Sequence, residues 1–109
     1  SFIMQYENVT AIAKGNVYFD GKIVSHAIIM PSGDKKTMGV IQPGEYHLGT
    51  EAAELMEIAG GSCSVVLDGT TESKQVSEGS SFSVVKNSGF TITVSAGEPC
   101  HYVCSYITE

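Results

Sequence analysis

The chain has 109 residues, of which 42% are hydrophobic and 17% are charged, so it is long and apolar enough for one folded domain and is not a disordered chain. Twelve acidic residues against six basic ones give a net charge of −6, which argues against nucleic acid polymers as partners. All six basic residues are lysines, so any anion site must use lysine, hydroxyl and backbone N–H donors. No apolar run reaches the roughly 20 residues that cross a bilayer, so we expect no membrane partner.

The first residues, SFIMQYENVT, lack the basic start and apolar stretch of a signal peptide. We therefore expect a cytoplasmic protein. Residues 1–14 are predicted to be an N-terminal extension, in which Val9, Ala11 and Ala13 can add an edge strand, and residues 15–109 are predicted to form one domain. An odd count of cysteines in no disulfide or zinc pattern predicts three reduced and mostly buried thiols, Cys63, Cys100 and Cys104.

Turn signals recur about every ten residues along the chain, with β-branched and aromatic segments between them. They stand at PSGD (31–34), QPGE (42–45), AGG (59–61), DG (68–69), EGS (78–80), NSG (87–89) and AGEP (96–99). Residues 50–58 are interpreted as a loop that runs into a strand through Met56 and Ile58. Alternation in the last third places Phe90, Ile92 and Val94 on one face of a strand. This pattern predicts an all-β sandwich or barrel with little helix.

Alternation near the C-terminus predicts that Tyr102, Cys104 and Tyr106 share one face of the last strand. By the same rule, Tyr46 and His47 point to opposite faces, so only one of the two side chains lines the interior.

Two stretches carry more than strand pattern, namely 43–65 (PGEYHLGTEAAELMEIAGGSCSV) and 76–94 (VSEGSSFSVVKNSGFTITV). They resemble the two halves of a cupin, a small double-sheet barrel of the jelly-roll kind. In this comparison Glu54 and Gly61 match the first cupin motif, while Gly79 and the turn at 87–89 match the second. The resemblance implies a cupin fold for residues 15–109.

Further segments narrow the resemblance to one family. NVYFDGK (16–22), GVIQPGEY (39–46), GSSFSV (79–84) and YVCSY (102–106) are similar, in this order, to the pyrimidine/purine nucleoside phosphorylases. These are single-domain cupins, and the likeness covers about residues 16–107. It implies that inorganic phosphate, as co-substrate, attacks C1′ of purine and pyrimidine nucleosides and releases the base and ribose 1-phosphate. It also implies a homodimer that needs no cofactor.

Metal binding is the obvious alternative, because most cupins hold a metal with three histidines and a glutamate. His47 and Glu54 fit two of these positions. The other two fall on Gly49 and Phe90, which have no ligand atom, and two ligands do not hold a divalent ion tightly. The sequence therefore predicts no metal site.

Phosphorolysis needs a stabilised oxocarbenium-like sugar, a hydrogen-bonded leaving base and convergent donors for phosphate. Glu54 and His47 are the candidate catalytic residues, since either can hold the ribose hydroxyls or donate to the base. Lys35 and Thr37 are candidates for a phosphate cradle. The resemblance leads us to expect arginines near Lys35 and at the position of Ser105, and both are absent.

The remaining candidates would contact the base. Tyr46, Tyr102 and Tyr106 are predicted to stack on it, and Gln42 to donate a hydrogen bond to base or phosphate. Two other function classes stay open at this point: a metal-dependent cupin enzyme, such as an isomerase or dioxygenase, and a non-catalytic barrel that binds a small ligand.

Overall fold

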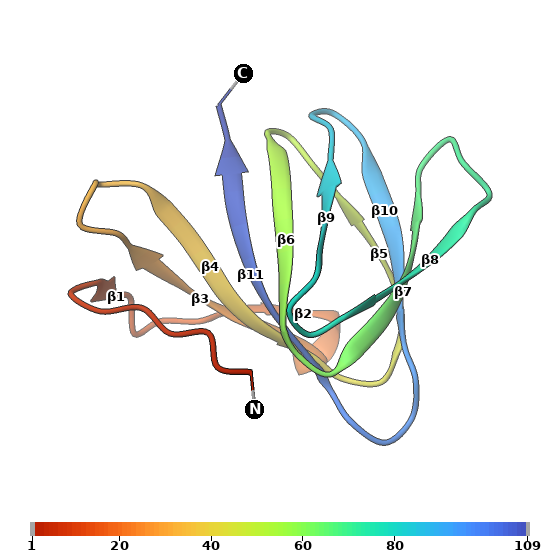
Figure 1. Cartoon of the computed structure of the whole chain (residues 1–109), viewed down its shortest axis with the longest axis horizontal. Coiled ribbons are helices and arrows are strands. Elements are labelled where there is room, and N and C mark those ends of the chain that lie inside the picture. Colours follow the sequence, from red (N-terminus) through yellow and green to blue (C-terminus); the bar gives the residue numbers. More distant parts are fainter. Residues whose placement is uncertain (1, 109) are drawn as a thin grey trace.

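The chain folds almost entirely into β-strands, as a computed structural model that describes residues 2–108 shows (Figure 1). The first strands are β1 (Thr10–Ala11), β2 (Asn16–Tyr18), β3 (Ile23–Ile29), β4 (Lys35–Ile41), β5 (Gly44–Gly49) and β6 (Ala53–Gly60). They are followed by β7 (Ser62–Leu67), β8 (Ser73–Ser77), β9 (Ser81–Val84), β10 (Gly89–Val94) and β11 (Cys100–Ile107). One 3₁₀ turn, η1 (Phe19–Gly21), is the helical element of residues 2–108.

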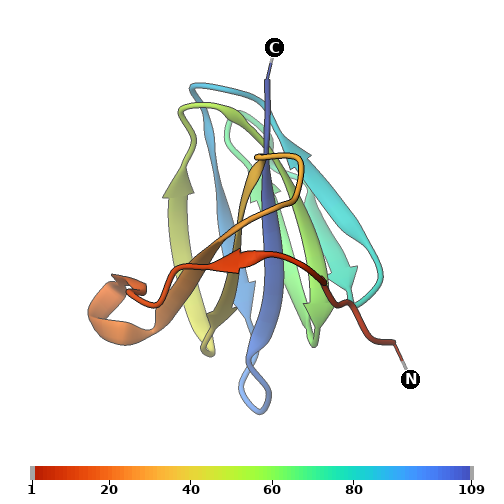
Figure 2. The same cartoon turned by 90° about the vertical axis from the view of Figure 1, so that its left-hand side faces the viewer.

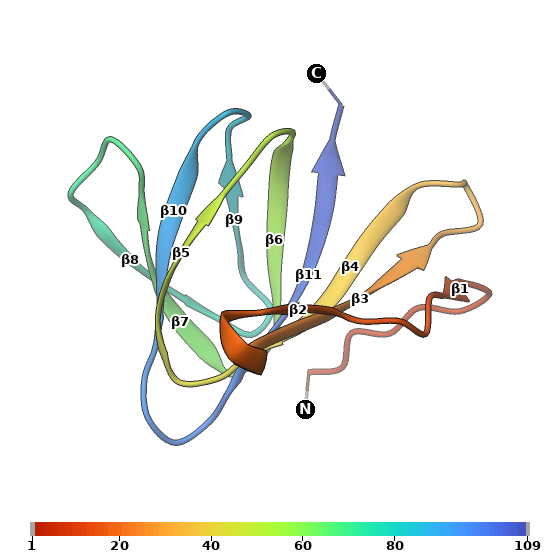
Figure 3. The same cartoon turned by 180° about the vertical axis from the view of Figure 1, so that it is seen from behind.

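The strands form two antiparallel sheets that face each other. Sheet A has seven strands in the order β1-β3-β4-β11-β6-β9, with β2 paired to β3, and sheet B has four in the order β5-β10-β7-β8. The two sheets are seen on the two sides of Figure 1 and, from behind, in Figure 3. The all-β, cupin-like double-sheet fold predicted from the sequence is confirmed.

The core lies between the sheets, where inward residues of both meet. Phe90, Ile92 and Val94 of β10 are all buried there, as the alternation predicted. Tyr102 and Cys104 of β11 share this inward face. All three cysteines are buried and free, in agreement with the prediction.

The segment before β2 crosses the outer face of sheet A (Figure 2). Residues 10 and 11 pair with β3 at the edge of the sheet, and the Ile12 N–H donates to the Ala27 carbonyl. Farther toward the N-terminus, the Tyr6 ring lies 5.7 Å from the Lys36 ammonium. The segment thereby covers the side of the sheet opposite to the core.

Residues 50–58 differ in extent from the interpretation made from the sequence. The strand β6 begins at Ala53 rather than near Met56, because Glu54 and Leu55 already pair with β11 and β9. Glu54 therefore lies on a strand and not in a loop. Separately, none of the helical structure in residues 2–108 is long and apolar enough to cross a membrane.

Candidate active site

A cavity of about 530 Å³ opens between the two sheets. Sheet A contributes most of its polar groups, which we call the polar wall: Lys35, Thr37, Glu54, Cys104 and Tyr106. Sheet B contributes Leu48 and Phe90, which we call the apolar wall. The cavity therefore combines groups that can bind a polar ligand with a surface that excludes water.

The polar wall results from the register of three neighbouring strands. In β11, Tyr106 lies opposite Glu54 of β6, and Ser105 lies opposite Lys36 of β4. The next position of β4 along this ladder is Lys35, so Lys35, Tyr106 and Glu54 form one row across the sheet. One step deeper, Cys104 lies opposite Thr37. Since residues two apart on a strand share a face, both rows point into the cavity.

Glu54 is half-buried, and loss of water around its carboxylate raises its pKa, while a hydrogen bond with Cys104 opposes this shift. The same burial, together with the charge of Glu54, raises the pKa of the Cys104 thiol to about 12. Burial also raises the pKa of Tyr106. At neutral pH the thiol and phenol therefore remain donors beside the carboxylate.

Tyr102 forms the deeper end of the polar side. Its ring lies over Gly39 of the neighbouring strand, where an added Cβ would stand only 2.4 Å from the ring carbon Cζ. Its hydroxyl reaches Ser25 of β3, and burial raises the pKa of Tyr102 to about 12. Ser25 in turn accepts a hydrogen bond of 3.3 Å from Asn16 Nδ2. This end is polar and carries no ionised side chain.

An aromatic corner closes the same end of the cavity. Tyr18 and Phe19, at the junction of β2 and η1, both line the cavity and are about half exposed. Phe19 and Asp20 have left-handed φ values of 52° and 55°, which are rare for residues other than glycine. The Phe19 ring packs against Tyr46 with ring centres 5.1 Å apart. Backbone strain of this kind often occurs at ligand-binding sites.

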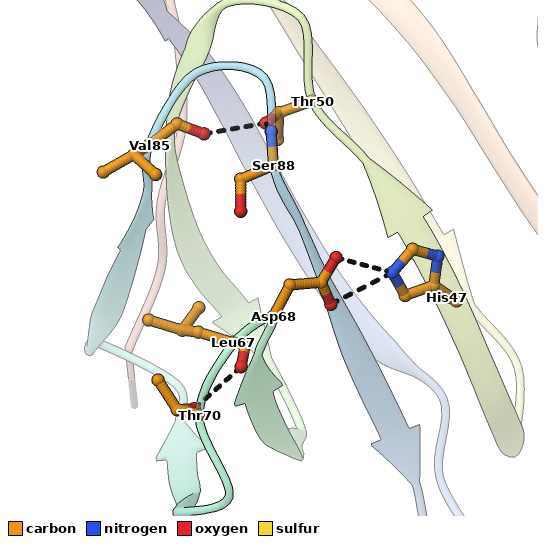
Figure 4. Close-up of polar contacts among 7 residues, drawn as sticks. All are labelled: His47, Thr50, Leu67, Asp68, Thr70, Val85 and Ser88. Carbon is orange, nitrogen blue, oxygen red and sulfur yellow. Dashed lines mark hydrogen bonds and ion pairs between the residues drawn. The ribbon is translucent and has the colours of Figure 1, made fainter.

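His47 borders the cavity, but its ring is turned away from Glu54. Its neighbours Tyr46 and Leu48 pack in the core, so alternation directs the ring to the outer face of sheet B. There His47 Nε2 lies 3.0 Å from Asp68 Oδ2 (Figure 4). The pair sits over Gly89, where an added Cβ would come 2.7 Å from the carboxylate. His47 and Glu54 therefore do not converge on one ligand.

Tyr46 and Gln42 lie outside the cavity lining. The Tyr46 hydroxyl donates to the main-chain carbonyls of Gln42 and Pro43, at 2.8 and 3.1 Å. The ring is buried in the core, so the inward member of the Tyr46–His47 pair is the tyrosine, and its face is covered by Phe19.

The structure thus brings six of the eight predicted site residues to one cavity and leaves out Gln42 and Tyr46. The sequence interpretation missed Asn16 and Ser25, which line the same cavity. A polar residue between Ile23 and Ala27, in an alternating β-branched segment that the structure shows to be β3, is the signal that points to Ser25. No comparable signal marks Asn16.

Metal ligands do not gather in the described part of the chain. Within residues 2–108, no group of three or more His, Cys, Asp or Glu side chains is placed to hold an ion. The polar wall offers one carboxylate, one thiol of raised pKa and hydroxyls, a set that suits hydrogen bonding to a sugar or phosphate better than metal ligation.

Fold and cavity define a small, cupin-like double-sheet protein with an amphipathic cavity between its sheets. The family model described as "Pyrimidine/purine nucleoside phosphorylase" matches residues 13–106. The chain belongs to this family.

Relatives and solved structures agree with this assignment. The chain is 50% identical over 103 residues to the pyrimidine/purine nucleoside phosphorylase of Paraburkholderia xenovorans, which covers 94% of this chain and 95% of that protein. The protein of the same name from Dechloromonas aromatica is 50% identical over 102 residues, with 94% and 97% covered. A crystal structure of an Acinetobacter protein of unknown function superposes with a TM-score of 0.90 at 41% identity, covering 94% and 98% of the two chains.

Proposed function

We propose that this protein cleaves purine and pyrimidine nucleosides with inorganic phosphate, giving the free base and ribose 1-phosphate, and that it needs no metal. Its relatives carry the name of this activity. The observation in this chain that supports it most is the row of Lys35, Tyr106 and Glu54 at the cavity, which sets a cation and a hydroxyl donor beside a carboxylate.

Phosphate would bind at the Lys35 side of this row. The Lys35 ammonium supplies the charge, and the hydroxyls of Thr37 and Tyr106 supply neutral donors on the same face of sheet A. A single lysine gives a point charge without the paired geometry of arginine. We therefore expect moderate phosphate affinity that falls as salt is added.

The ribose would bind beside phosphate, with Glu54 accepting hydrogen bonds from its hydroxyls. A carboxylate beside the sugar also stabilises the positive charge that develops on the sugar as the glycosidic bond breaks. The apolar wall, Leu48 and Phe90, excludes water from the opposite side, which strengthens these interactions and limits hydrolysis.

The reaction balances without a cofactor. A phosphate oxygen forms the new bond to C1′ while the C1′–N bond breaks and its electron pair stays on the base nitrogen. Hydrogen phosphate loses its proton on becoming ribose 1-phosphate dianion, and the released base takes up one proton. The protein then has to position three groups and stabilise charge, which such a cavity can do.

Incubation of the purified chain with uridine or inosine, with and without phosphate, tests the proposal. We expect base and ribose 1-phosphate in equal amounts, and base release only when phosphate is present. Lys35→Ala should raise the KM for phosphate at least about tenfold, as loss of a charge-assisted hydrogen bond does. Lys36→Ala is the matched control, because Lys36 points to the outer face and bonds Ser105.

Three other results of this assay would each indicate a different function. Base release that is independent of phosphate would indicate a hydrolase. No release, together with tight binding of nucleosides, would indicate a non-catalytic binding protein. Stoichiometric metal in the active protein, with activity lost on chelation, would indicate a metal-dependent enzyme instead.

The assembly and location implied by the family resemblance belong to the same proposal. We propose that the protein acts as a homodimer in the cytoplasm. Light scattering on the purified chain checks the first point and cell fractionation the second.

A further inference from the structure

We infer that Tyr102, oriented by Asn16 and Ser25, donates a hydrogen bond from its hydroxyl to the base as the base leaves, so that this end of the cavity is the base subsite. The inference rests on the proposed function, since it assigns one end of the cavity to one part of the substrate. It also assigns a role to Asn16 and Ser25, which the sequence did not single out.

The direction of the hydrogen bonds supports this role. The amide nitrogen of Asn16 can only donate, so at 3.3 Å the Ser25 oxygen is its acceptor. Ser25 lies opposite Gly39, which lies opposite Tyr102, so the Ser25 hydroxyl is within reach of the Tyr102 oxygen. Its contribution lowers the pKa of Tyr102, as a hydrogen bond donated by Ser25 to the phenol oxygen does. The hydrogen of the Tyr102 hydroxyl is then left for a group in the cavity, where all three residues form part of the lining.

The packing holds Tyr102 in place for this purpose. Its side chain is 8% exposed, and its ring lies across Gly39, the one residue type that leaves room for it there. Burial keeps the phenol protonated throughout the neutral range. The group therefore remains a donor and never becomes a charged acceptor that would repel the leaving base.

The spacing of the rows separates this end from phosphate. Tyr102 and Tyr106 are four residues apart on β11, which is about 13 Å along a strand. A phosphate at the Lys35 row and a base at Tyr102 leave room for the sugar between them. Tyr18, half exposed on the same side of the cavity, offers a ring on which a base can stack.

The same arrangement suits both purines and pyrimidines. Every nucleobase presents a carbonyl oxygen or ring nitrogen that accepts a hydrogen bond, and one hydroxyl donor on a rotatable C–O bond can meet either. Asn16 adds an amide oxygen that can accept from a base N–H. Negative charge accumulates on the base as the C1′–N bond breaks, so the Tyr102 hydrogen bond strengthens in the transition state.

The test compares two leaving groups with the full chain. Uridine and inosine release bases that need a hydrogen-bond donor, while 4-nitrophenyl β-D-ribofuranoside releases an anion that is already stable. We expect Tyr102→Phe to lower kcat on uridine and inosine by about 10²-fold. On the nitrophenyl riboside the loss should be less than about threefold, and the KM for phosphate should not change.

Asn16→Ala and Ser25→Ala extend the test to the positioning residues. Each should lower kcat on uridine by about 3- to 10-fold and, like Tyr102→Phe, spare the nitrophenyl riboside. Val17→Ala is the matched control, since Val17 lies between Asn16 and Tyr18 on β2 but is exposed and does not line the cavity. It should behave as the wild type.

The outcomes separate this inference from the proposed function. Equal losses on both kinds of leaving group, or a Tyr102→Phe variant as active on uridine as the wild type, would overturn the inference and leave phosphorolysis standing. A wild-type protein that cleaves no nucleoside with phosphate would overturn the proposed function, and this inference with it.

Discussion

The two walls of the cavity differ in what they do for the protein. The apolar wall belongs to sheet B, where Phe90 is 1% exposed and its ring packs edge-to-face on Phe82 at 5.3 Å. The polar wall belongs to sheet A, where Glu54 and Cys104 occupy inward positions that an ordinary core would fill with apolar residues, and the exposed Lys35 also lines the cavity. The comparison indicates that sheet B presents a tightly packed apolar surface to the cavity, while sheet A presents most of its polar groups.

This division has an energetic basis. Burying an apolar ring is favourable in proportion to its area, while taking a carboxylate out of water opposes folding. The raised pKa of Glu54 is the direct sign of that cost. Substitutions in the apolar wall should therefore mainly lower stability. Substitutions in the polar wall should mainly lower activity.

Loss of the Phe90 ring should have the largest effect. We expect Phe90→Ala to lower the free energy of unfolding by about 3–5 kcal/mol, because a buried aromatic is lost and a cavity remains. Chemical denaturation measures this. Phe90→Leu is the control and should lose much less, and a Phe90→Ala protein of unchanged stability would contradict the role of the apolar wall.

Glu54→Gln should have the largest effect on the reaction. The amide keeps the shape of the side chain but removes the charge that stabilises the sugar, so we expect kcat to fall about 10²-fold while the protein stays folded. Steady-state kinetics with inosine and phosphate measure this. Glu57→Gln is the matched control, since Glu57 pairs with Val103 on the other face of β6. Full activity in Glu54→Gln would remove Glu54 from the mechanism.

An added methyl group at Gly39 should disturb both stability and the base subsite. The Cβ would lie 2.4 Å from the Tyr102 ring, so the ring has to move and Gly39→Ala should cost about 1–3 kcal/mol. Thermal unfolding measures this cost. In Gly49→Ala the nearest atom to the new Cβ is 3.7 Å away, so this control should unfold at nearly the wild-type temperature.

Glu54 should also make stability depend on pH. Its pKa is raised in the folded protein, so between the unfolded value of 4.5 and the folded value the folded state binds more protons. Stability therefore falls as pH rises through this window. We expect Glu54→Gln to melt at a higher temperature than the wild type at pH 7 and at the same temperature near pH 4. A lower melting temperature at pH 7 would contradict this.

The His47–Asp68 pair should have the smallest effect. Both side chains are well exposed, at 58% and 41%, and such surface pairs contribute about 0–1 kcal/mol. His47→Ala should change stability by less than about 1 kcal/mol and kcat by less than about threefold. A large loss of kcat would show that the ring turns into the cavity during the reaction.

The strands could be predicted from the sequence because their signals are local. Turn residues and alternation identified β10 and β11, and the inward faces of both are as expected. The start of β6 was missed, since the composition of TEAAELMEI does not favour a strand and only pairing with β11 and β9 extends it. Local preference was overridden there by tertiary contacts.

The site could be predicted only in part, because it depends on register between distant strands. That Lys35, Tyr106 and Glu54 share one row follows from pairing across about 70 residues of chain, which periodicity does not determine. Alternation indicated that one of Tyr46 and His47 faces inward, but the choice depended on how β5 packs on sheet A. Asn16 was missed for the same reason, since its role depends on pairing with Ser25.

The proposed arrangement of phosphate, ribose and base in the cavity is best tested by a crystal structure with phosphate and an uncleavable nucleoside analogue. We expect phosphate within hydrogen-bond distance of Lys35 Nζ and Thr37 Oγ1, ribose hydroxyls bound to Glu54, and the base against Tyr102. Phosphate bound outside this cavity, or a nucleoside bound with its base at Lys35, would contradict it.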